Sequence, residues 1–263
     1  MTSQVNACLV CAHPSQYGIF PFHFKCTTCG CETYQGERSD VRYSLLNRTP
    51  VLANVYANLV REGLGNRVLD VGCGDGQLVA LLRRDGVEAW GIDISLEQIR
   101  VAEATVGEFF CAKTTCQIRD RFDSILYIDS IEHFWDPVEE LKRARALLKP
   151  GGSIFLYLPG VENALYRTFC AMHKVGFPRH LMAYWALASP YPHRALVSDR
   201  GLKLMANAAD LTCEINAATR FGKLAHIPTQ PRSKYITALY PWRFCRLRVS
   251  GQLADTSSRQ PSS

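Results

Sequence analysis

The sequence predicts an α/β fold organised around an open, largely parallel β-sheet, and three observations carry this prediction. Residues 67–71 (RVLDV) form a short, mostly apolar run that is typical of a buried parallel strand. Three glycines follow, Gly72, Gly74 and Gly76, and they permit a tight turn into residues 77–84, which have the pattern of a helix. A second apolar run at residues 89–93 predicts the neighbouring strand.

Two acidic residues narrow the class of ligand that this turn would bind. Asp70 lies on the first strand, where its charge would repel a pyrophosphate but would hold the amino group of a zwitterionic ligand. Asp93 ends the second strand, about twenty residues later, and is placed to bind two ribose hydroxyls. The two acids therefore favour a ligand that carries both an amino group and a ribose.

Four motifs follow one another along the chain. They are DVGCGDG at residues 70–76, GID at 91–93, RFDS at 121–124 and LKPGG at 148–152. In order and spacing they resemble the motifs of class I S-adenosylmethionine-dependent methyltransferases. The resemblance covers residues 64–217 and implies a Rossmann-like, seven-stranded sheet with helices on both faces. It also implies S-adenosylmethionine as the methyl donor, with these candidate contacts: Asp70, Gly72, Gly74, Asp93, Ile94 and Asp129.

Length and composition fit one α/β domain with a small appendage. The chain has 263 residues, of which 47% are hydrophobic, and it contains no uninterrupted apolar run long enough to span a membrane. The N-terminal residues lack the pattern of a signal peptide. The eleven cysteines occur as Cys-x-x-Cys pairs and as single residues in apolar runs, which fits reduced thiols and a metal. We therefore expect a cytoplasmic protein.

The net charge of +6 is unevenly distributed. Residues 220–263 contribute a net charge of +7, so the rest of the chain carries −1. The expected catalytic body is thus close to neutral, which argues against a nucleic-acid substrate.

Four cysteines near the N-terminus have the spacing of a metal site. Two Cys-x-x-Cys pairs are separated by fourteen residues, and their members are Cys8, Cys11, Cys26 and Cys29. Such pairs deliver four thiolates to a tetrahedral zinc ion, although they could also be unconnected free thiols. Substitute ligands lie nearby, namely Cys31, His13 and His23. The pattern resembles the zinc ribbon that precedes the methyltransferase domain in many bacterial sugar and small-molecule methyltransferases. We place a structural zinc ribbon at residues 1–35.

The remaining boundaries follow from helical spacing and composition. Residues 36–63 would link the ribbon to the body and include a helix, residues 50–62, that caps the cofactor pocket. The methyltransferase domain would span residues 64–245, with residues 234–240 as its last strand. Residues 246–263 would form a disordered tail.

An aromatic insert, residues 160–192, falls on the acceptor side of the expected active site. Such a segment most often forms a lid over a small substrate. It could instead make weak contact with a membrane surface, but its basic residues are too few for strong attachment. We therefore favour the lid.

A second group of candidate residues follows the predicted strand at 122–128. Asp129, Glu132 and His133 have i, i+3 and i+4 spacing, so one helical turn places them on one side. They could brace the loop, supply His133 and Glu132 for catalysis, or bind a divalent cation such as Mg²⁺ or Mn²⁺. Similar segments bind Mg²⁺-type ions in ubiquinone-biosynthesis and small-RNA 2′-O-methyltransferases. His193, after the insert, is a second candidate base or a hinge residue for the lid.

The predicted function is methyl transfer from S-adenosylmethionine to a small-molecule or glycan acceptor, at a hydroxyl oxygen. A nearby imidazole suits this acceptor, because a hydroxyl must lose its proton during transfer. Two alternatives stay open. One is an RNA methyltransferase that uses the ribbon to bind nucleic acid, and the other is a catalytically silent binding protein of the same fold.

Overall fold

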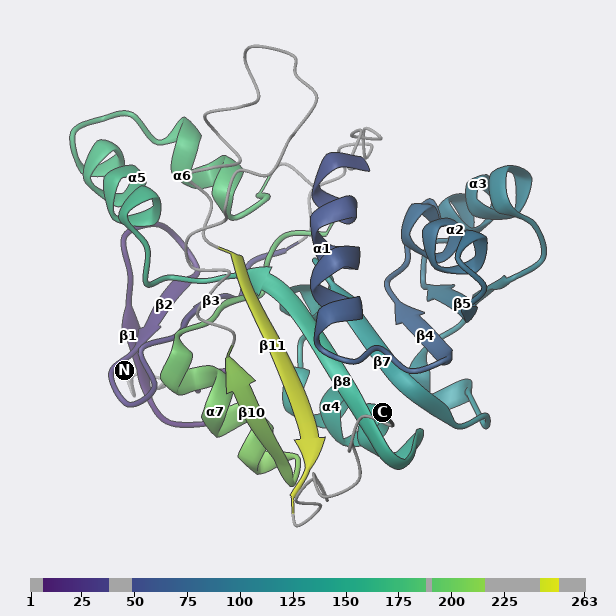
Figure 1. Ribbon diagram of the computed structural model, residues 1–263. Helices are drawn as coiled ribbons and strands as arrows, with labels where there is room; N and C mark the ends of the chain where they lie inside the picture. The colour runs from purple at the N-terminus through teal and green to yellow at the C-terminus, as the bar shows by residue number, and fades with distance from the viewer. Residues whose placement is uncertain (1–6, 38–48, 188–190, 216–241, 251–263) are drawn as a thin grey trace, which may run out of the picture.

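The computed structural model describes residues 7–37, 49–187, 191–215 and 242–250 (Figure 1). Within these residues the centre is a seven-stranded sheet with the order β10-β11-β8-β7-β4-β5-β6. Its strands are β4 (Arg67–Val71), β5 (Glu88–Asp93), β6 (Phe110–Ala112), β7 (Phe122–Ile128), β8 (Leu148–Pro159), β10 (Leu211–Ile215) and β11 (Trp242–Val249). Neighbours from β8 to β6 are parallel, whereas β11 runs antiparallel to both β8 and β10. The predicted α/β class and seven-stranded sheet are confirmed.

Helices cover both faces of this sheet. They are α1 (Thr49–Arg61), α2 (Gln77–Arg84), α3 (Leu96–Val106), α4 (Pro137–Ala146) and α7 (Asp199–Ala208), with short turns η1 (Thr115–Gln117) and η2 (Ile131–His133). Successive residues of a strand face opposite sides, so Val68 packs with α1, α2 and α3, while Leu69 packs with α4 and α7. Burial on both faces explains why these strands read as continuous apolar runs. Among the described helices, none has both the length and the hydropathy that a membrane crossing requires.

Strand β11 corrects the predicted C-terminal boundary. Residues 246–249, which we expected in a disordered tail, form the second half of β11 and pair with both neighbours. Arg243 of this strand is buried and makes ion pairs with Asp199 at 2.7 Å and Glu162 at 3.0 Å. Part of the basic charge of residues 220–263 therefore has a structural role. The predicted last strand and the rest of the tail lie outside the described residues, at 234–240 and 251–263.

The N-terminal ribbon forms a second sheet, with the order β1-β2-β3-β9. Its first strands are β1 (Ser15–Tyr17), β2 (His23–Cys26) and β3 (Glu32–Tyr34), and all neighbours are antiparallel. The fourth strand, β9 (Ala195–Leu196), comes from the part of the chain that follows the aromatic insert. The ribbon therefore shares a sheet with the body and is not an independent lobe.

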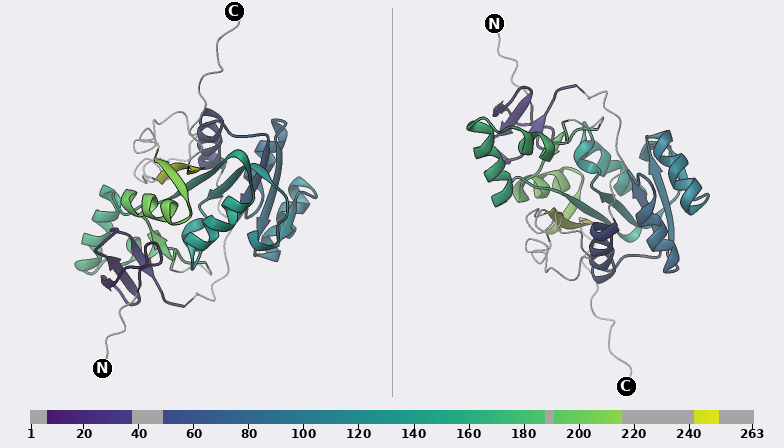
Figure 2. Two further views of the ribbon diagram at one scale, coloured as in Figure 1. Left: turned by 90° about the horizontal axis from the view of Figure 1, so that it is seen from below. Right: turned by 90° about the horizontal axis from the view of Figure 1, so that it is seen from above.

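Two helices of the aromatic insert, α5 (Ala164–Lys174) and α6 (Arg179–Tyr184), cover the ribbon. Trp185 is fully buried and meets the rings of Phe20 and His23 edge-on, with centroid distances of 5.8 and 5.1 Å. Figure 2 shows the ribbon and these helices together at one end of the molecule, away from α2 and α3. Much of the aromatic content of the insert thus attaches the ribbon to the body.

Glu32 is a buried carboxylate at the centre of this contact. It lies 2.9 Å from His23 Nε2 and 3.3 Å from Lys25 Nζ, and it accepts a hydrogen bond from the Tyr166 hydroxyl of α5. Burial opposes ionisation of Glu32, but the hydrogen bonds from His23 and Tyr166 outweigh this effect, so its pKa is lowered. One carboxylate therefore links the ribbon to α5.

We expect Glu32→Gln to lower the free energy of unfolding by about 1–3 kcal/mol at neutral pH, because buried hydrogen bonds are weakened. Because the pKa of Glu32 is lowered in the folded state, wild-type Glu32 stabilises the fold at pH values above its ordinary pKa of 4.5. This contribution is lost as the pH falls through the lowered pKa. Urea titrations over an acidic-to-neutral series measure both effects, with the exposed Glu108→Gln as a control. Equal stability of the two variants at neutral pH would refute the role of Glu32.

Candidate active site

The glycine-rich turn between β4 and α2 lies at the carboxyl edge of the parallel strands. Gly72, Gly74 and Gly76 all have positive φ angles, of 75°, 55° and 78°. A Cβ atom at Gly72 would lie 2.6 Å from the Cβ of Ser130, so glycine is required where the turn passes the loop after β7. The Ser130 hydroxyl donates a hydrogen bond to the Val71 carbonyl at 2.7 Å. The turn and the β7 loop are thus held side by side.

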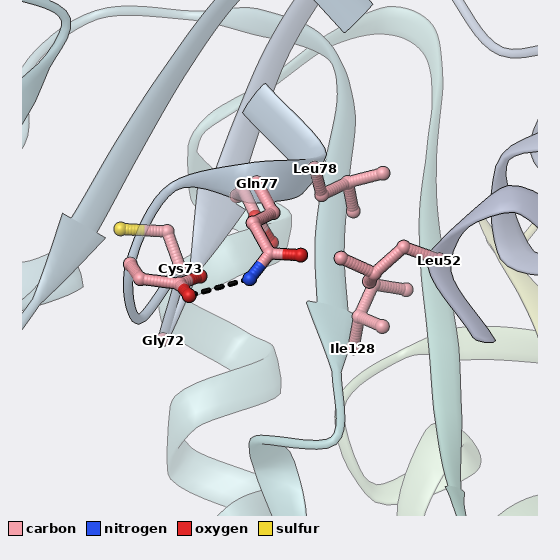
Figure 3. Close-up of a pocket in the computed structure, with 8 residues that line it drawn as sticks. Leu52, Gly72, Cys73, Gln77, Leu78 and Ile128 are labelled. Atoms are coloured by element: carbon pink, nitrogen blue, oxygen red, sulfur yellow. Dashed lines mark hydrogen bonds between the residues drawn. The ribbon is translucent and has the colours of Figure 1, made fainter. Parts of the chain in front are cut away.

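A small, open pocket lies beside this turn (Figure 3). It is lined by Leu52, Asp70, Gly72, Cys73, Asp75, Gln77, Leu78 and Ile128. Leu52 belongs to α1, so this helix has the capping position that the sequence predicts. Asp70 is only 3% exposed and supplies a carboxylate to the pocket wall from a nearly buried position.

Gln77 and Ile128 line the pocket although sequence reasoning did not assign them to it. The Gln77 amide donates a hydrogen bond to Asp75 Oδ2 at 2.5 Å, which Figure 3 shows as a dashed line. Their positions in the chain could have identified both residues as lining the pocket. Gln77 is the first residue of α2 after the glycines, and Ile128 is the last residue of β7.

Asp93, at the end of β5, is fixed by two backbone N–H groups. Its Oδ2 accepts from Gly74 at 3.0 Å, and its Oδ1 accepts from Ser95 at 2.8 Å. The carboxylate therefore lies against the glycine turn, since β4 and β5 are parallel neighbours. Ile94 follows directly and is 57% exposed, so it offers an apolar surface at the same edge.

The structure brings the second group of candidate residues together. One ligand atom from each residue lies within 4.8 Å of the others, in a cluster formed by Asp129, Glu132, His133 and His193. The first three come from the end of β7 and from η2, whereas His193 comes from the segment before β9. The imidazole centroids of His133 and His193 are 4.9 Å apart. Sequence spacing grouped the first three residues, and the structure adds His193 as the fourth.

Backbone contacts fix this four-residue cluster. Asp129 has a φ of 58°, and its N–H donates to the Tyr157 carbonyl of β8 at 2.7 Å. The carbonyl of Glu132 accepts a hydrogen bond from the Arg194 N–H at 2.6 Å. The β7 loop is thus attached both to the sheet and to the segment that carries His193.

The contact of His133 with Pro192 defines its tautomer. The Nδ1 atom lies 3.1 Å from the Pro192 carbonyl oxygen, which can only accept a hydrogen bond. In the neutral ring Nδ1 therefore carries the hydrogen, and Nε2 keeps the lone pair. That nitrogen is the one that can accept a proton or bind a cation.

The cluster contains the donor atoms that a divalent transition metal prefers. Two carboxylates and two imidazoles suit ions such as Mn²⁺ or Fe²⁺. Ligands on opposite sides of such an ion are roughly 4 Å apart, so side chains whose ligand atoms lie within 4.8 Å of one another need only small movements to bind one ion. Glu132 and His193 are 1% and 9% exposed, so half of the donor set is shielded from water.

The four predicted zinc ligands also converge. Their sulfur atoms lie within 4.8 Å of one another, with 3.6 Å between Cys8 and Cys29 and 3.5 Å between Cys11 and Cys26. Thiolates around a tetrahedral zinc ion, with bonds of about 2.3 Å, are roughly 3.8 Å apart. Hydrogen bonding to Cys29 and burial raise the pKa of the Cys8 thiol, so a cation is needed to hold this thiol ionised. The donor set fits zinc.

The three substitute ligands have other positions. His23 bonds to Glu32, and His13 is exposed, with its Nδ1 2.8 Å from the Cys11 carbonyl. Cys31 is buried, and its sulfur accepts a hydrogen bond from the Ser198 N–H at 3.4 Å. None of them belongs to the cysteine cluster found among the described residues.

Comparison with known proteins agrees with this geometry. A family model described as "Methyltransferase domain" matches residues 45–214, more than half of the chain. Among curated relatives is the ubiquinone biosynthesis O-methyltransferase of Actinobacillus pleuropneumoniae serotype 5b (strain L20). It is 34% identical over 115 residues, which cover 38% of this chain and 49% of the relative. The chain thus spans about half the length of the curated relatives that it matches.

Solved structures share the fold. The magnesium protoporphyrin IX methyltransferase of Synechocystis PCC 6803 with bound SAH (S-adenosylhomocysteine) has a TM-score of 0.55 and 17% identity, covering 80% of this chain and 90% of that one. The plantazolicin methyltransferase, in complex with a triazolic desmethylPZN analog and SAH, has a TM-score of 0.53 and 17% identity, covering 77% and 83%. At these identities the likeness concerns the fold. The matched family model shows that the chain belongs to the methyltransferase-domain family.

Proposed function

We propose that this methyltransferase acts on a hydroxyl of a small molecule or glycan, and that a divalent cation at the four-residue cluster assists the transfer. The convergence of Asp129, Glu132, His133 and His193 is the observation that carries the proposal. Asp129 directly follows Ile128, which lines the pocket, so the cluster begins where the pocket ends. The name of the curated relatives, ubiquinone biosynthesis O-methyltransferase, supports an oxygen acceptor.

The methyl donor would bind in the pocket beside the glycine turn. Asp70 would hold its amino group, and Asp93 would accept hydrogen bonds from its ribose hydroxyls. The turn at Gly72 and Gly74 would let the backbone approach the donor closely, and Ile94 would offer an apolar surface to the adenine ring. Asp129 would contact the donor on the side that faces the cluster.

On the acceptor side, the protein would align the hydroxyl in line with the methyl group and remove its proton. The sulfonium donor is already activated, so alignment accounts for much of the rate. An imidazole that does not ligate the cation, at His133 Nε2 or at His193, would accept the proton, and the buried Glu132 carboxylate would stabilise the imidazolium that results. A bound divalent cation would lower the pKa of the hydroxyl.

We also propose that Cys8, Cys11, Cys26 and Cys29 hold a structural zinc ion in a cytoplasmic protein. The eleven cysteines are free thiols, as a reducing compartment requires. Ribbons of this size seldom fold without their metal. Folded, reduced protein with much less than about one zinc per chain on elemental analysis would contradict this assignment.

The geometry gives little support to the ribbon as an RNA-binding module. Phe20 and Phe24 are buried, so their rings cannot stack on bases, although Tyr17 and Phe22 are exposed; Lys25, the one lysine or arginine between the cysteine pairs, pairs with Glu32. Since Tyr166 and Trp185 attach the aromatic insert to the ribbon, we propose that the insert forms a wall of the acceptor site.

Asp93→Ala should weaken SAH binding by about 1–3 kcal/mol, because ribose hydroxyls would lose their acceptor and Gly74 would lose its anchor. Titration calorimetry measures this loss, with the exposed Glu108→Ala as a control. Thermal unfolding of both variants shows whether the fold is retained. Unchanged affinity in folded Asp93→Ala protein would eliminate the ribose assignment.

His133→Ala and His193→Ala should each lower kcat by about 10²–10⁴ while SAH affinity stays near wild type. The acceptor is first identified by transfer of a labelled methyl group into a metabolite extract. Removal of the cation by a mild chelator, with zinc content checked, should also reduce turnover, and added Mn²⁺ should restore it. The exposed Glu108→Ala, which lies outside the insert and the cluster, is the control.

Wild-type turnover in both cluster variants would contradict the proposed base. Full activity after chelation would separately contradict the proposed cation. If both results were obtained, the cluster would have a structural role, and catalysis would rest on alignment alone.

A further inference from the structure

His193 is linked to the ribbon through Trp185, whereas Asp129 is bonded to the central sheet. The N–H of His193 donates to the Trp185 carbonyl at 3.0 Å, and Trp185 packs against Phe20 and His23 of the ribbon. In contrast, Asp129 bonds directly to β8. The cluster is therefore assembled from two parts of the fold.

The segment that follows His193 contacts the ribbon along its whole length. The Arg194 carbonyl accepts from the Tyr34 N–H at 2.9 Å, and its guanidinium donates to the Gly36 carbonyl at 2.5 Å. Strand β9 then pairs with β3, with Ala195 opposite Thr33. Residues 194–196 thus continue the ribbon sheet.

At the end of this segment, Ser198 contacts the zinc-binding loop itself. Its hydroxyl donates to the carbonyl of Cys29, a predicted zinc ligand, and its N–H donates to Cys31 Sγ. The Cys31 N–H in turn donates to Cys29 Sγ at 3.4 Å. A Cβ atom at Gly201 would lie 2.0 Å from Cys31 Sγ, so the start of α7 meets this loop without room for a side chain.

The opposite side of the same segment contacts the cluster. The Arg194 N–H donates to the Glu132 carbonyl at 2.6 Å, and the Pro192 carbonyl meets His133 Nδ1 at 3.1 Å. Arg194 and Ser198 are almost completely buried. Residues 192–198 therefore lie between the zinc-binding loop and the β7 loop, with contacts to both.

The ribbon sheet needs a bound metal for its stability, because its strands are short. The three N-terminal strands have only three or four residues each, and β9 has two, which is too little to be stable alone. A module of this size gains its folding energy from bound zinc. Without zinc, the pairing that places Arg194 and His193 would be lost.

We propose that the zinc ribbon positions the acceptor site: it orders residues 192–198, sets His193 beside Glu132, and thereby makes the cation affinity of the cluster depend on zinc. The expected change in Mn²⁺ affinity rests on the proposed function, whereas the expected ordering of residues 192–198 does not. Because Asp70 lies within β4 and Asp93 is fixed by backbone N–H groups at the end of β5, donor binding should not depend on zinc.

Three forms of the protein test this proposal: wild type, the zinc-free Cys26→Ser/Cys29→Ser variant, and Ser198→Ala. The last keeps all four zinc ligands but removes the hydroxyl that contacts Cys29. The exposed Cys116→Ser is the matched control. Amide hydrogen exchange by mass spectrometry follows residues 191–198, and calorimetry gives the affinities for Mn²⁺ and SAH.

In the zinc-free variant, exchange in residues 191–198 should rise by about tenfold or more, whereas exchange in residues 67–76 should stay at the wild-type rate. Mn²⁺ affinity should fall by about tenfold, with SAH affinity within about twofold of wild type. Ser198→Ala should keep its zinc and show a smaller rise in exchange and a smaller loss of Mn²⁺ affinity.

Wild-type exchange in residues 191–198 of the zinc-free variant would overturn the proposal. If the double variant also lost SAH binding, global unfolding would explain it, and Ser198→Ala would then decide: unchanged exchange there would overturn the proposal. Should wild-type protein bind no Mn²⁺ while exchange still depends on zinc, the positioning role would stand and the proposed cation would fall. Normal Mn²⁺ binding without zinc would overturn the coupling and leave the cation site intact.

Discussion

The pairing of β9 with β3 is the contact that joins the ribbon to the acceptor half of the candidate site. It consists of two register pairs, Glu32 with Leu196 and Thr33 with Ala195, and so short a pairing is not stable alone. Buried polar contacts at each end support it. Arg194 bonds to the β3 side and to the β7 loop, and Ser198 bonds to the cysteine loop. Through these contacts the ribbon, the aromatic insert and the β7 loop form one unit.

The two halves of the candidate site differ in how they are built. The donor half is local, since Asp70, the glycine turn and Asp93 lie within two adjacent parallel strands and the turn between them. The acceptor half joins the β7 loop to a segment some sixty positions later, through contacts that pass by the ribbon. Damage to the ribbon should therefore affect the acceptor half first, because local structure opens where few residues hold it.

The same difference explains what the sequence could predict. The strands of the donor half, the glycine turn and the grouping of the four cysteines depend on short-range spacing, and they were predicted from it. Strand β11 was missed because its basic charge was assigned to a tail. In its second half two arginines, Arg246 and Arg248, alternate with the apolar residues Leu247 and Val249. Strand β9 has two residues and no pattern of its own. Its role follows only from long-range pairing, whereas His193 was expected from the sequence as a second candidate base beside the active site.

The central claim is that the cluster at the end of β7, completed by His193, binds a divalent cation beside the methyl donor. The most direct test is diffraction from crystals grown with Mn²⁺ and SAH, with data collected on both sides of the manganese absorption edge. The account predicts an anomalous peak between Asp129, Glu132, His133 and His193, next to SAH in the pocket lined by Asp70. SAH bound in that pocket with no anomalous peak at the cluster would contradict it.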